Sequence, residues 1–73
     1  MHETVEDFIN RIFQYHPPKP DQVPRYEEIR NKAREFAHFI RENTPESPEQ
    51  TLALRALSDA VMKANMAIAV NEI

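Results

Sequence analysis

The sequence IFQYHPPKPDQVPRYEEIRNKA, residues 12–33, decides how this chain is divided into helices. It places four prolines in a chain that has no glycine. The prolines of HPPKP, residues 16–20, cannot continue a helix, so an apolar helix that precedes them has to end there. Pro24 suits the first turn of a second helix, with Asp21 or Gln22 as its N-cap. The stretch therefore predicts two helices joined by a stiff corner that is longer than a plain connector requires.

Apolar residues at helical spacing predict three helices. The first is expected over residues 4–13, and the second from residue 24 to residue 43 or 44. The third begins with SPEQ, a capping-box pattern in which Ser47 is the N-cap and Gln50 its reciprocal partner, and continues to Asn71. No strand pattern, repeat or low-complexity segment is present. We therefore expect one all-α domain over the 73 residues, with a short N-terminal helix, a Pro-rich corner and two longer antiparallel helices.

The third predicted helix has more apolar surface than one small bundle can bury. The stripe of the second helix consists of Tyr26, Ile29, Ala33, Phe36, Ala37 and Ile40, and that of the third of Leu52, Leu54, Leu57 and Val61. In AVMKANMAIAV, residues 60–70, only Lys63 and Asn65 interrupt apolar positions on all sides of the axis. The chain has no cysteine, so disulfides cannot supplement its small core. We expect an interlocked helical homo-oligomer rather than a monomer with an exposed apolar tail.

The charged residues are distributed unevenly. The net charge is −3, but residues 11–34 hold six basic and three acidic residues, which leaves −6 on the remainder. This distribution favours a small anion over a nucleic acid polymer, although an ordinary solvated charge mix stays open. No apolar run reaches the ~20 residues of a membrane span, and the N-terminal MHETVEDF is acidic rather than signal-like. We therefore expect no membrane partner and a cytosolic location.

Catalysis has little support in the residue types. The chain has no Gly-rich phosphate loop, no thiol nucleophile and no recognisable Ser/His/acid set. His2, His16 and His38 do not have the spacing of metal ligands. We expect no catalytic residue, no metal and no cofactor. Two alternatives to a binding protein stay open: a metal-dependent cyclic nucleotide hydrolase that uses Glu28 and Glu35 across an oligomer, and a purely structural helical oligomer.

Ligand binding is better supported, at the proline corner. Tyr15 lies beside the rigid prolines, and an aromatic ring that stacks on a nucleobase contributes about 1–3 kcal/mol per base. Arg25, Arg30 and Lys32 lie in the first turns of the next helix, where the positive helix end also favours phosphate. Tyr26 lies on the apolar stripe and is expected in the core. For Tyr15, spacing alone leaves a core role and a ligand role open.

Three segments in order resemble the small phage anti-CBASS proteins that act as sponges for cyclic oligonucleotides. They are FQYHPPKPDQVPRYEEIRNKAREFA, TPESPEQTLALRAL and AVMKANMAIAVNE, and the resemblance extends over residues 8–72. It implies a compact hexamer of interlocked protomers. It also implies that the protein sequesters cyclic di- and trinucleotides in the host bacterial cytoplasm without cleaving them, which blocks the activation of immune effectors.

The resemblance also implies roles for single residues. The family's base-stacking tyrosine corresponds to Tyr15, and its phosphate-contacting basic residue to Arg30, with Lys32 as second choice. Where the family has lysine, the planar fork of Arg30 changes the contact geometry. His16 and Arg25 complete the predicted ligand-binding set, whereas the family's separate trinucleotide site is not assigned to any residue. A ring with two phosphates and two bases matches two copies of the corner, related by a two-fold axis.

Overall fold

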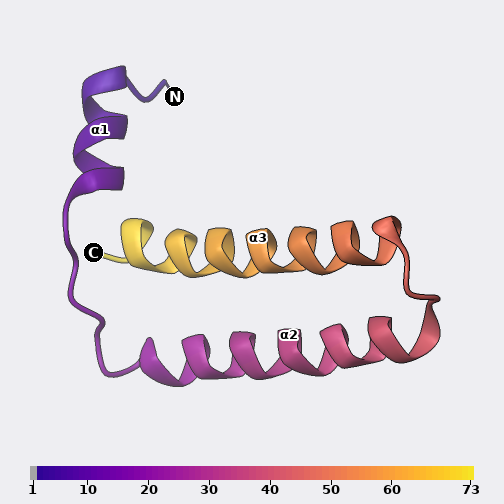
Figure 1. The fold of residues 1–73 in the computed structure, drawn as a ribbon. Helices are drawn as coiled ribbons and strands as arrows, with labels where there is room; N and C mark the ends of the chain where they lie inside the picture. Colours follow the sequence, from indigo (N-terminus) through magenta and orange to yellow (C-terminus); the bar gives the residue numbers. More distant parts are fainter. Residues whose placement is uncertain (1) are drawn as a thin grey trace.

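The computed structural model describes residues 2–73 and contains three helices, α1 (Val5–Phe13), α2 (Val23–Asn43) and α3 (Pro48–Asn71). α2 and α3 lie side by side in antiparallel directions as a long hairpin, and α1 extends from the open end of that hairpin (Figure 1). The predicted all-α order of short helix, Pro-rich corner and two longer helices is confirmed. None of these helices has the length and hydropathy needed to span a bilayer, over the part of the chain that the structure describes.

The first two helices begin in different ways. α1 has a capping box that was not predicted from the sequence. Thr4 Oγ1 accepts a hydrogen bond from the Asp7 backbone N–H at 3.0 Å, and the Asp7 carboxylate accepts one from the Thr4 N–H at 3.4 Å. α2 begins at Val23, one residue earlier than expected. Gln22 occupies its N-cap position, and the Gln22 side chain makes no capping bond. That side chain bonds instead to the backbone of Lys19 and of Glu72.

The predicted capping box of α3 is half right. Ser47 Oγ accepts a hydrogen bond from the Gln50 backbone N–H at 3.1 Å, as expected for the N-cap. The prediction of a reciprocal bond from the Gln50 side chain to the N-cap residue is wrong. Gln50 Nε2 donates instead to the Thr44 carbonyl oxygen at 3.1 Å and to Thr44 Oγ1 at 3.0 Å. Gln50 therefore ties the start of α3 to the end of α2 and fixes the turn of the hairpin.

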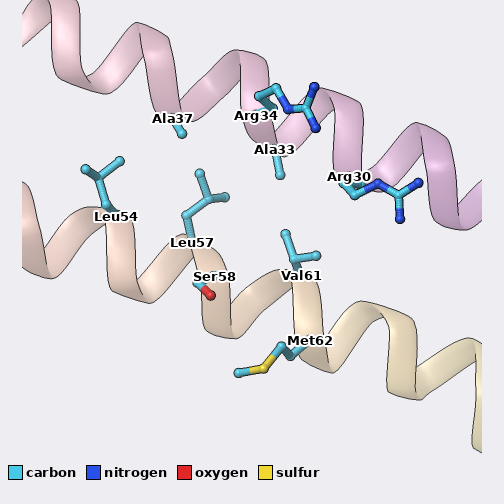
Figure 2. Close-up of a pocket in the computed structure, with 9 residues that line it drawn as sticks. All are labelled: Arg30, Ala33, Arg34, Ala37, Leu54, Leu57, Ser58, Val61 and Met62. Atoms are coloured by element: carbon cyan, nitrogen blue, oxygen red, sulfur yellow. The ribbon is translucent and has the colours of Figure 1, made fainter.

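Small residues of α2 face branched residues of α3 along the seam of the hairpin. Ala33 and Ala37 point toward Leu57 and Val61, which allows the two helices to approach closely (Figure 2). Leu52, placed on this stripe from the sequence, is 61 % exposed, because a residue two positions from Leu54 lies on another side of the helix. Phe36 was likewise expected on the stripe of α2. It lies at the edge of the seam with 53 % of its surface exposed.

The single chain buries very little of its apolar surface. Ile68 and Val70 are the buried hydrophobic residues among those described, at 8 % and 6 % exposure. The accessible surface is 6107 Å², whereas a compact monomer of this mass exposes roughly 4,700 Å². The radius of gyration is 15.7 Å, against about 11 Å for a compact domain of this length. The chain is therefore an open hairpin with a projecting helix rather than a closed bundle.

Candidate ligand-binding site

Residues 14–22 form the corner between α1 and α2, and they pass the C-terminal end of α3 (Figure 1). Gln22, at the end of the corner, is 3 % exposed and more deeply buried than any other residue from 2 to 73. Its Oε1 accepts a hydrogen bond from the Lys19 backbone N–H at 2.9 Å, and its Nε2 donates to the Glu72 carbonyl oxygen at 3.3 Å. Because both ends of the buried amide are bonded, Gln22 holds the corner against the end of α3.

An ion pair strengthens the same junction. Arg25 Nη1 donates to Glu72 Oε2 at 3.0 Å, its Nη2 donates to Glu72 Oε1, and Asp21 Oδ2 lies 3.8 Å from Nη2. The hydrogen bond from Arg25 is the main reason that the pKa of Glu72 lies below its ordinary value of 4.5, and a hydrogen bond from Gln22 adds to it. The same contact raises the pKa of Arg25. Arg25, predicted to bind phosphate, is therefore held by carboxylates in this chain.

A second arginine holds α1 against the end of α3. Arg11 Nε and Nη2 donate to the Glu3 carboxylate at 2.6 and 2.9 Å, and Arg11 Nη1 donates to Asn71 Oδ1 at 3.5 Å. The hydrogen bond from Arg11 lowers the pKa of Glu3. Since these groups are partly exposed, the pair orients α1 more than it stabilises the fold. Asn71, at the end of α3, and Glu72, directly after it, are thus the point where α1, the corner and α2 meet.

The corner, α2 and α3 enclose an open hollow of about 460 Å³, named here the corner hollow. Its lining consists of His16, Pro18, Tyr26, Arg30, Asn65, Met66 and Ala69. Of the five predicted ligand-binding residues, it brings His16 and Arg30 together. Arg30 is exposed and makes no ion pair with another residue between 2 and 73, so its charge is available to an anion.

The other predicted residues lie outside the corner hollow. Tyr15 is on the corner, but its side chain is 80 % exposed. Lys32 lies on α2, where its Nζ is 3.9 Å from the Glu28 carboxylate. It borders a different hollow, together with Ile29. Within one chain, the structure therefore does not bring Tyr15, Arg25 or Lys32 into the hollow that contains Arg30.

Arg30 also borders a second hollow of about 290 Å³ over the hairpin seam. Figure 2 shows its apolar floor, made by Ala33, Leu57 and Val61, with Arg30 and Arg34 extending from α2 beside it. The Arg30 guanidinium thus stands at the boundary between the two hollows. An anion bound at either one would meet the same positive charge.

Two residues of the corner hollow were not identified as site residues from the sequence. Tyr26, expected in the core, is half-buried and forms part of the wall beside Arg30. From the sequence, Asn65 was an interruption of an apolar run and a position within AVMKANMAIAVNE, the third segment of the family resemblance, and it was given no role in the site. The signal that could have found it is its spacing: Asn65 is four residues from Ala69, so both lie on the face of α3 that borders the hollow.

Comparison with known proteins connects this geometry to a family. Residues 6–69 match the family described as Acb2/Tad1, hairpin domain. The chain belongs to this family. No curated protein and no solved structure matches it. The Acb2/Tad1 hairpin proteins are the phage sponges for cyclic nucleotides that counter CBASS and Thoeris defence, which confirms the resemblance stated from the sequence.

Membership in the Acb2/Tad1 family implies that the chain binds cyclic nucleotides and opposes bacterial defence by sequestering them. The match includes Arg11 and Arg25 but excludes Glu3 and Glu72, the carboxylates paired with them. The two ion pairs that fix α1 and the corner therefore each join a matched residue to one outside the matched segment.

Proposed function

We propose that this chain captures cyclic dinucleotides and cyclic trinucleotides intact, and so blocks the activation of CBASS effectors in the cytoplasm of the host bacterium. The observation that carries the proposal is the state of Arg30, an arginine without a carboxylate partner among residues 2–73, beside a hollow with an aromatic wall. The guanidinium fork suits a phosphate, and the ring of Tyr26 and the apolar side chains suit the sugar and base.

Tyr15 supports the proposal as the base-stacking residue. A tyrosine with 80 % of its surface exposed has most of its ring available to a ligand or a neighbouring copy. It stands on a corner stiffened by proline and fixed by Gln22, so little conformational entropy is lost when a base stacks on it. Stacking of this kind contributes about 1–3 kcal/mol per base.

The site requires a second copy of the chain. A cyclic dinucleotide carries two phosphates and two bases, whereas one chain offers a single Arg30 and a single Tyr15. A copy related by a two-fold axis supplies the second pair. The surface of 6107 Å² exceeds that of a compact monomer by about 1,400 Å², which is the scale of an obligate interface for each protomer. We propose the hexamer that the resemblance implies.

The structure also suggests how the predicted residues divide their roles. We assign Tyr15, Arg30 and His16 to direct contact with the ligand. Arg25 would contact phosphate only by leaving Glu72, so we assign it to holding the corner. Lys32 borders another hollow, and it would reach a ligand only as the contribution of a neighbouring copy.

A sponge and an enzyme differ in the state of the ligand after binding. The purified protein is incubated with a cyclic dinucleotide, separated from free ligand and denatured, and the released nucleotide is identified by mass spectrometry. Intact ring in stoichiometric amount supports the sponge. Linear nucleotide that accumulates with time contradicts it.

The same experiment tests the two alternatives. A hydrolase that uses Glu28 and Glu35 predicts linear product that depends on a divalent metal. In the described chain Glu28 is paired with Lys32, and residues 2–73 contain no group of three or more His, Asp or Glu side chains placed to hold a metal ion. A purely structural oligomer predicts that no cyclic nucleotide is retained at all.

A further inference from the structure

Two polar atoms at the corner hollow have no hydrogen-bond partner among the described residues. They are Asn65 Oδ1 and His16 Nε2, and both are closed off from solvent, so the Asn65 side chain has to rotate before its Oδ1 can meet a ligand in the hollow. Both residues line the hollow that contains Arg30. Buried polar atoms without a partner are rare because they forfeit hydrogen bonds to water without replacing them. Gln22 shows the usual solution in the same corner, since both ends of its amide are bonded.

The position of Asn65 makes its unpaired oxygen notable. It lies within the most apolar part of α3, where leucine or methionine would fill the same space without the cost of an unpaired acceptor. Arg30 and Tyr26 border the hollow from α2, and Met66 and Ala69 border it from α3. The hollow thus combines a cation for phosphate, an aromatic and apolar wall for a base face, and an unsatisfied amide for a base edge.

We propose that Asn65 is a specificity-determining residue of the cyclic nucleotide site and that it recognises the amino group of an adenine base. This inference rests on the proposed function. A carboxamide pairs with adenine through two bonds, because Oδ1 accepts from the N6 amino group while Nδ2 donates to N7. Hypoxanthine and guanine present the O6 acceptor at the same position, which leaves Asn65 Oδ1 facing another acceptor.

The competing explanation is a structural bond within the chain. His16 Nε2 can donate or accept, depending on the tautomer, so a rotation of either side chain could join it to Asn65. In that case Asn65 would stabilise the corner and would have no preference among bases. The two explanations predict opposite changes in stability when the amide is removed, and this separates them.

The test compares cyclic diadenylate with cyclic di-inosine monophosphate, which differs by a 6-oxo group in place of the 6-amino group. Affinities for both rings are measured by calorimetry on the full-length wild type and on Asn65→Leu. We expect the wild type to prefer the diadenylate by about 10-fold or more. Asn65→Leu should bind both rings with equal affinity and should melt at a higher temperature, because the unpaired acceptor is gone. Leu52→Met, a volume-conserving change on α3 at an exposed residue outside both hollows, should keep the wild-type preference.

A ligand-side measurement keeps the inference testable if Asn65→Leu does not fold. A diadenylate built with 7-deazaadenine lacks the N7 acceptor, so wild type should bind it several-fold more weakly than the parent ring. Where Asn65→Leu does fold, it should not distinguish the two rings, as expected for a coupled pair.

Several results would overturn the inference. One is a wild type that binds adenine and hypoxanthine rings equally. Another is an Asn65→Leu variant that loses affinity for both rings alike and melts lower, which indicates a bond to His16. A wild type that binds neither ring overturns the proposed function, and this inference with it.

Discussion

The side chain of Gln22 donates a hydrogen bond to the backbone carbonyl oxygen of Glu72, over 3.3 Å and across 50 residues of sequence. It is the most direct link between the proline corner and the end of α3. The Arg25–Glu72 ion pair lies on the same junction. The position of Tyr15 relative to Arg30 therefore depends on the last turn of the chain as well as on the prolines.

Removal of the Gln22 amide should loosen the corner. Gln22→Ala leaves the Lys19 N–H and the Glu72 carbonyl without their partner, so we expect the free energy of unfolding to fall by about 1–3 kcal/mol. The measurement is urea unfolding at a fixed protein concentration, because assembly contributes to apparent stability. Gln14→Ala is the control, since Gln14 is exposed and lies at the other end of the corner. An equal effect of the two substitutions would show that the buried amide is not a fixed point.

The Arg25–Glu72 pair predicts a pH-dependent contribution to stability. The pairing places the pKa of Glu72 below its ordinary value of 4.5 in the folded chain. The contribution is therefore complete above the unfolded pKa and is lost as the pH falls through the lowered folded pKa. Glu72→Gln removes the charge but keeps the carbonyl that Gln22 uses, so it should melt below wild type at pH 7. At pH 3 the difference between the two melting temperatures should shrink. A difference that stays constant with pH would contradict the ion pair.

The helix boundaries were predictable because local chemistry determines them. Proline ended α1 and opened α2 and α3, and the Ser47 side chain capped α3 as its sequence pattern indicated. One error occurred where a side chain had a choice of partners. Gln50 bonds back to Thr44 rather than to the N-cap. The error at Leu52 was of another kind, because its spacing of two from Leu54 already places it on a different side of the helix.

The site was less predictable because its contacts join distant parts of the sequence. Arg30 and His16 were chosen for their chemistry, and the corner hollow brings them together. No local pattern relates Arg25 to Glu72, so the ion pair between them could not be predicted from the sequence. Asn65 was equally hard to find, since its unpaired oxygen is a property of the packed hollow.

Loss of the Tyr15 ring should weaken ligand binding without unfolding the chain. Since the side chain is 80 % exposed, Tyr15→Ala should keep the helical content seen by circular dichroism. The lost stacking corresponds to about 1–3 kcal/mol, or roughly a 5- to 150-fold weaker affinity for a cyclic dinucleotide. Tyr15→Phe keeps the ring and should bind nearly as well as wild type. Unchanged affinity of Tyr15→Ala would move the stacking role to another aromatic residue, with Tyr26 the first to examine.

Two arginines on α2 offer a matched comparison. Arg30 borders both hollows, whereas Arg34, one turn later, borders the seam hollow only. If the phosphate binds at the corner hollow, Arg30→Ala should weaken cyclic dinucleotide binding at least 10-fold and reduce its salt dependence, while Arg34→Ala should have a small effect. Arg30→Lys should recover part of the affinity, because it restores the charge but not the fork. Equal losses for both alanine variants would instead place the phosphate over the seam.

The apolar face of α1 predicts that copies of the chain associate. Phe8 and Phe13 are 45 % and 77 % exposed, and a helix as short as α1 is marginal in water without tertiary packing. Phe8→Ser combined with Phe13→Ser should therefore shift the sedimentation of the protein toward smaller species and lower its helical content. Asn10→Ser, which replaces one polar residue of α1 with another, should leave the assembly unchanged. Val61→Asp would be a poor substitute, because Val61 lies in the seam and its replacement disrupts the hairpin itself. Wild-type protein that sediments as a single protomer would contradict both the assembly and the paired site built on it.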